Sequence, residues 1–146
     1  MLRRRYLLLA SVLAACAGHQ KIELAPDRAA LSSIHTLFLG DFGTADRSDV
    51  VKEKVRVLLL NAKRFSVVDA ADRADAILTG AVGVDAGQYR GTTDYAGTGV
   101  LRLVETKTQR TIWVHEYKRG YMFGGSVSTR VAKQMVDHLL KDAGNF

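Results

Sequence analysis

The sequence predicts a single α+β domain in which two main helices pack on one mixed β-sheet. Three observations lead to this class. The chain has 146 residues, about the size of one domain. Its composition, 47% hydrophobic and 25% charged with one proline, is typical of a globular protein. Its hydrophobic pattern switches between strand-like and helix-like periods. We expect the order β-α-β-β-β-β-α over residues 33–146.

The first half of the domain is predicted to be a β-α-β unit. Residues 34–39 are apolar on both alternating faces, which suits a central strand. Residues 46–63 carry apolar side chains at helical spacing, and Asp46, Ser48 and Asp49 are expected to supply its N-terminal caps and negative charge. The apolar stripe comprises Val51, Val55, Leu58, Leu59 and Ala62. Residues 65–69 form the second strand, reached by a right-handed crossover.

The second half is predicted to be an antiparallel meander followed by a helix. A long strand covers residues 76–89 and ends in a turn at 90–94. Residues 98–105 and 110–119 form a hairpin across a polar turn. Residues 126–143 have apolar positions at four-residue steps and form the final helix, with a glycine following as a stop.

The first 15 residues are predicted to be a cleavable signal peptide. Three arginines precede a short apolar run, which is too short to cross a hydrocarbon core of ~30 Å. Leu13-Ala14-Ala15-Cys16 resembles the bacterial lipobox, in which the cysteine is acylated and becomes the first mature residue. A plain signal peptide with an incidental cysteine is the alternative. Cys16 is the only cysteine, which excludes an internal disulfide.

Residues 16–32 are predicted to be the lipidated cysteine and a tether that keeps the domain close to its membrane. By resemblance to sorted lipoproteins, Ala17 is not the aspartate that retains a lipoprotein in the inner membrane, so we expect the outer membrane, facing the periplasm. Removing the three signal arginines lowers Lys plus Arg from 21 to 18 against 15 acidic residues, a formal charge of +3. No strong basic stripe remains, and a nucleic-acid partner is not expected.

Residues 63–69, 74–82 and 101–113 carry a family resemblance. The segments Lys63-Arg64-Phe65-Ser66-Val67-Val68-Asp69, Ala74-Asp75-Ala76-Ile77-Leu78-Thr79-Gly80 and Leu101-Arg102-Leu103-Val104-Glu105 resemble the CsgG-like domain, shared in outline by CsgG, LpoB and the N-terminal domain of TolB. The resemblance implies an envelope lipoprotein fold and says little about task. The candidate insertion points for the pore hairpins of CsgG are too short here, and the tether is shorter than the LpoB linker.

The sequence contains no recognisable set of catalytic residues. Asp41-Phe42-Gly43 matches a kinase motif by letters only, and Gly97-Thr98-Gly99 lacks the third glycine of a dinucleotide loop. The four histidines have no metal-like spacing. We therefore expect no enzyme activity, no metal and no cofactor.

Two features are candidate protein contacts. Tyr121, Met122 and Phe123 place large apolar groups in an expected strand-to-helix loop. Trp113 and Tyr117 share one strand face, which is either exposed or packed under a helix. If the hairpin pairs in register, Ile112 and Val114 lie on the other face of the strand, together with Leu101 and Leu103. A lid over the core is the alternative for the first group.

These expectations favour a non-catalytic outer-membrane lipoprotein, anchored by its lipid and facing the periplasm. The leading hypothesis is an adaptor that binds an envelope protein during envelope assembly or secretion. The alternatives are a self-assembling ring of a secretion apparatus, which makes an oligomer possible, and an envelope hydrolase.

Overall fold

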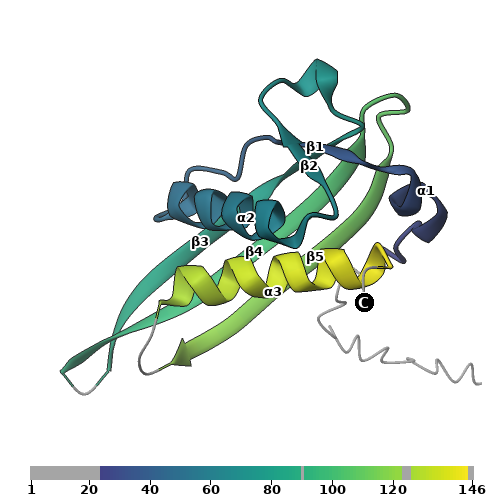
Figure 1. The fold of residues 1–146 in the computed structure, drawn as a ribbon. Helices are drawn as coiled ribbons and strands as arrows, with labels where there is room; N and C mark the ends of the chain where they lie inside the picture. The colour runs from purple at the N-terminus through teal and green to yellow at the C-terminus, as the bar shows by residue number, and fades with distance from the viewer. Residues whose placement is uncertain (1–23, 90, 123–125, 145–146) are drawn as a thin grey trace, which may run out of the picture.

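The computed structural model describes residues 24–89, 91–122 and 126–144, and Figure 1 shows their fold. In chain order the elements are α1 (Arg28–Ser33), β1 (Thr36–Leu39), α2 (Ser48–Ala62), β2 (Ser66–Val68), a 3-10 turn η1 (Ala71–Arg73), β3 (Ala76–Tyr89), β4 (Thr92–Glu105), β5 (Thr111–Met122) and α3 (Val127–Asp142). The α+β class and the succession of five strands and two main helices are confirmed.

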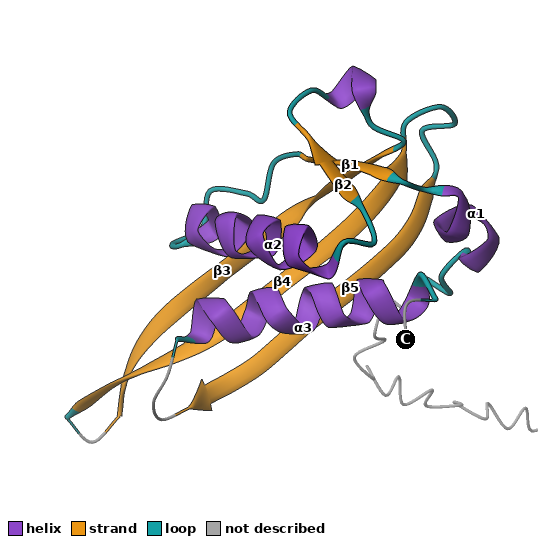
Figure 2. Cartoon of the chain, viewed as in Figure 1, coloured by secondary structure: helices purple, strands orange, loops and turns teal. Residues whose placement is uncertain are grey.

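The strands form one mixed sheet in the order β2-β1-β3-β4-β5. β1 pairs in parallel with β2 and with β3, while β3, β4 and β5 are antiparallel. α2 and α3 lie side by side on the same face of this sheet (Figure 2), and α1 lies at one end (Figure 1). The domain therefore has two layers, and its core lies between the sheet and the helix pair.

The core is built from the alternating residues of the strands that face α2 and α3. Leu39, Leu78, Leu103 and Trp113 follow one another across four strands, and all are almost fully buried. From the helices come Val51, Val55 and Leu59 of α2 and Val131, Ala132, Met135, Val136 and Leu139 of α3. The predicted stripe of α2 is thus largely confirmed, although Leu58 is only partly buried.

The start of α2 differs from the prediction. Arg47 is the N-cap residue, in the left-handed conformation with φ 59°, and no side chain caps the helix. The Ser48 hydroxyl donates instead to the Gly43 carbonyl at 2.8 Å, and the Asp49 carboxylate accepts from the N–H of Val50. In α3 the cap is a serine, because Ser126 accepts from the N–H of Thr129.

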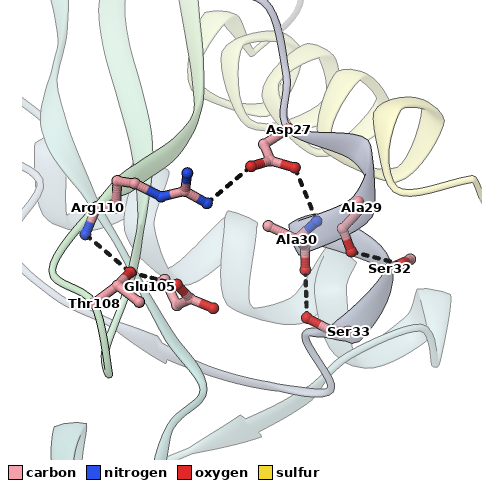
Figure 3. A network of polar contacts seen from close by, with 8 residues as sticks. All are labelled: Asp27, Ala29, Ala30, Ser32, Ser33, Glu105, Thr108 and Arg110. Carbon is pink, nitrogen blue, oxygen red and sulfur yellow. Dashed lines mark hydrogen bonds and ion pairs between the residues drawn. The ribbon is translucent and has the colours of Figure 1, made fainter.

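The predicted tether is wrong at its C-terminal end, because residues 28–33 form α1. Asp27 caps this helix by accepting from the N–H of Ala30 at 3.0 Å, and its second carboxylate oxygen pairs with Arg110 at 2.9 Å (Figure 3). The N–H of Asp27 also donates to the Ile112 carbonyl. Leu31 is fully buried, so the ordered domain begins before residue 33.

Both hairpins are longer than predicted. β4 begins at Thr92, directly opposite Tyr89, so most of the expected turn at 90–94 is strand. Gly91 has φ 82° in the left-handed region, which a tight hairpin turn requires. β5 extends to Met122 instead of ending at residue 119. Among the residues that the structure describes, no helix combines the length and apolar character needed to cross a membrane.

Candidate interaction surfaces

Trp113 and Tyr117 lie in the core, the alternative that the sequence left open. Trp113 is 1% exposed, and its indole Nε1–H donates to the Asp142 carboxylate of α3 at 2.9 Å. Tyr117 is 5% exposed and lies opposite Gly99. Neither side chain offers an exposed contact patch, so this candidate surface is corrected to a packing role.

The expected phase of β5 is wrong because of the observed register. Trp113 lies opposite Leu103, and Val114 lies opposite Arg102, so it is Trp113 that shares the face of Leu103. Ile112 is the extra residue between the pairs 103–113 and 104–111, at a β-bulge. The bulge lets two consecutive residues, Ile112 and Trp113, both be buried at 1% exposure, which strict alternation would not allow.

The other predicted site residues lie at the end of β5 or outside the described residues. Tyr121 and Met122 belong to the end of β5 rather than to a loop. Phe123 lies outside the described residues, as does Cys16. A contact role for residues 121–123 and lipidation of Cys16 therefore stay predictions.

The two segments that partly match kinase and dinucleotide-binding motifs have structural roles. Phe42 of the Asp41-Phe42-Gly43 segment is buried, and the N–H groups of Gly80 and Val82 on β3 donate to the carbonyls of Asp41 and Phe42 at 2.9 and 3.0 Å. Gly97 allows α3 to lie close to β4, because a Cβ there would be 2.5 Å from Val131 Cγ2. These contacts explain the glycines without a nucleotide site.

A pair of histidines that no sequence pattern indicated meets between β5 and α3. The rings of His115 and His138 stack with centroids 3.9 Å apart, and Trp113 stacks on His115 at 5.9 Å. They border a cavity of about 410 Å³ with Glu116, Tyr117, Lys118 and Gln134. Within the described ranges, no three His, Cys, Asp or Glu side chains gather as metal ligands. Parallel stacking aims the ring faces, not their nitrogen lone pairs, at each other.

Asp75 ties the strand ends together. One carboxylate oxygen accepts from the N–H groups of His35 and Thr36, both at 2.9 Å. The pKa of Asp75 is held below its ordinary value of 3.8, first by the His35 N–H and then by that of Thr36. The site is structural, since it joins the start of β1 to the start of β3.

The face of the sheet opposite α2 and α3 carries no helix among the described elements (Figure 2). We call it the open face. Its partly exposed apolar residues include Phe38, Val68, Ile77, Val100, Val104 and Val114. Val100 is 41% exposed, lies between Ala81 and Glu116, and is accompanied by exposed Arg102 and Lys118. A mixture of apolar and charged groups is typical of a non-obligate protein interface.

A second apolar surface lies on the outer side of α2. A groove of about 580 Å³ runs between α2 and the start of α3, lined by Asp49, Val50, Glu53, Lys54, Val57, Leu58 and Thr129. Val50 is 41% exposed, Val57 54% and Leu60 53%. Three of the five large apolar side chains that are exposed among the described residues therefore lie on this one helix. Such clustering, unlike scattered exposed residues, indicates an interaction surface.

Comparisons with known proteins place the fold. No family model and no curated protein matches the chain. A point-substituted PelC dodecamer from Paraburkholderia phytofirmans is similar at 16% identity and a TM-score of 0.54, covering 84% of this chain and 94% of that one. A second PelC dodecamer from that organism has 15% identity and a TM-score of 0.53, covering 75% and 86%. Lipoprotein GNA1162 from Neisseria meningitidis has 10% identity and a TM-score of 0.49, covering 77% and 99%.

The chain therefore shares its fold with PelC, and solved structures of bacterial lipoproteins are among those similar to it. At these identities the similarity establishes fold alone, and it leaves membership of the CsgG-like family a prediction.

Proposed function

We propose that the protein is a non-catalytic, lipid-anchored lipoprotein of the outer membrane that faces the periplasm and binds an envelope protein through the open face. The observation that carries the proposal is the open face itself. Among the described residues no helix covers this face of the sheet, and its apolar residues alternate with the charges of Arg102, Glu116 and Lys118. Antiparallel strands commonly leave one sheet face to solvent, so it is the apolar residues on this face, rather than its lack of a cover, that support a contact role.

Anchoring is supported by the lipobox-like Cys16 and by the point at which the ordered domain begins. Because α1 is tied to β5 through Asp27, Arg110 and the carbonyl of Ile112, the lipid end of the chain enters the domain at the α1 end. Only residues 17–26 then separate Cys16 from the cap residue, at most about 35 Å of extended chain. The domain stays beside its membrane, which suits an adaptor for a membrane-bound or nearby protein.

The test is crosslinked capture of the full-length protein from intact envelopes, followed by mass spectrometry. Val100→Lys should lose the partner while keeping its melting temperature, because Val100 is partly exposed and a lysine there lies beside Glu116. Lys107→Glu, in the exposed turn between β4 and β5, is the matched control and should retain the partner. Recovery of the same proteins with Val100→Lys would refute the open face as the contact.

A self-assembling ring is the second candidate, and the similarity to PelC favours it, because both PelC structures are dodecamers. Light scattering of the purified protein separates the two functions. An adaptor has the mass of one chain or of a pair of chains, whereas a closed ring has the mass of many.

A further inference from the structure

We propose that the outer side of α2 is a contact between two copies of this chain, formed by two α2 helices packed antiparallel about a two-fold axis. The contact surface is the α2 seam, defined as Val50, Glu53, Lys54 and Val57. It is separate from the open face and stands whether or not the open face binds another protein.

The spacing of the seam places its members on one stripe of the helix. Residues seven apart, such as Val50 and Val57, lie almost above one another, and Glu53 and Lys54 fall between them on either side of the line. The buried residues Val51, Val55 and Leu59 occupy another side of the same helix. α2 therefore carries apolar side chains on two of its sides, and the core uses only one of them.

The seam is complementary to itself when one copy runs antiparallel to the other. A two-fold axis between positions 53 and 54 sets Val50 of one copy opposite Val57 of the second, and Glu53 opposite Lys54. Both valine contacts then pair apolar surfaces, and both charged contacts pair opposite charges. A parallel arrangement would set Glu53 against Glu53 and Lys54 against Lys54, so charge complementarity selects the antiparallel register and a second copy as the occupant.

The charged residues of the seam are available for this pairing. Lys54 forms no ion pair among the described residues. Glu53 pairs within its own helix with Arg56 at 3.5 Å, but its side chain is 66% exposed, and such exposed pairs contribute little. Glu53 can therefore exchange Arg56 for the lysine of a second copy. The groove beside the seam, closed by Leu58 and Thr129, accommodates the side chains of the second helix.

Thiol crosslinking of the full-length protein in intact envelopes tests the register. The double variant Val50→Cys/Val57→Cys should give a covalent dimer after mild oxidation, because each cysteine faces the other type in the second copy. The two positions are about 10 Å apart along one helix, too far for a disulfide within a chain. Either single variant should crosslink much less, and the wild type, which holds only Cys16, and Lys107→Cys serve as controls.

Charge exchange tests the pairing. In the double-cysteine background, Glu53→Lys alone should lower the dimer yield about five- to thirtyfold, because two symmetric attractive pairs become repulsive. Adding Lys54→Glu should restore the yield, since the opposite charges face each other again.

Several outcomes would overturn the proposal: no covalent dimer from the double-cysteine variant, equal dimer from Val50→Cys alone, crosslinks to a different protein, or no rescue by the second charge change. A head-to-tail ring would also fail the rescue, because its contacts join two different surfaces. Loss of the dimer would leave the open-face capture experiment unaffected, so the two proposals fail independently. Melting temperatures measured for each variant identify any loss that comes from unfolding.

Discussion

Three consecutive leucines of α2 provide a matched test of the helix-layer packing. Leu59 is 0% exposed and belongs to the core, Leu60 is 53% exposed, and Leu58 is partly buried against the core. Truncation of Leu59 to alanine should lower the free energy of unfolding by about 2–5 kcal/mol, the range for buried leucines in which a cavity remains. Leu60→Ala should change it by less than about 0.5 kcal/mol, as for surface positions.

The loss expected for Leu59→Ala is large against the ~5–15 kcal/mol that stabilises an ordinary domain. It corresponds to a fall in melting temperature of about 10 °C or more for a domain of this size. Leu58→Ala should fall between its neighbours, because part of its surface already faces the groove.

Urea denaturation followed by circular dichroism, at protein concentrations low enough to keep the chain monomeric, measures all three variants on the same helix. The change in helix propensity is the same in all three variants, since each replaces leucine with alanine. If Leu60→Ala cost as much as Leu59→Ala, the assignment of the core side of α2 would be refuted.

Three further predictions follow from other elements. Cys16→Ala should stay unprocessed and unacylated, and fatty-acid labelling that persists in this variant would reject the lipobox. Gly97→Ala should destabilise the domain by about 1–3 kcal/mol in denaturant titrations through overpacking against Val131, whereas Thr98→Ala beside it, on the other face of β4, should cost less. Because the pKa of Asp75 is lowered in the folded state, its contribution to stability is present above its ordinary pKa of 3.8 and is lost as the pH falls through the folded value. The unfolding free energy should therefore fall on acidification below about pH 4, less steeply in Asp75→Asn, and equal slopes would contradict the role of the His35 and Thr36 N–H groups.

The sequence by itself determined the class of the domain and most of its elements. Periodicity is a local property, so the apolar positions of α2 and α3 and the alternation in β3 could be read directly from the residues. The bounds of β3 followed from local signals in the same way. α1 was missed because six residues show too little periodicity, and it is held by distant partners, Arg110 and Arg64.

Only the tertiary structure decided which surfaces are free. Whether Trp113 is core or contact depends on its pairing with Leu103 and on the bulge at Ile112, and a one-residue change in register reverses every side chain of a strand. The open face and the α2 seam are exposed because no other described element covers them, which depends on where α2 and α3 pack rather than on any residue alone. Burial is a property of what lies opposite a side chain, and in this fold the opposing segment usually comes from far along the chain.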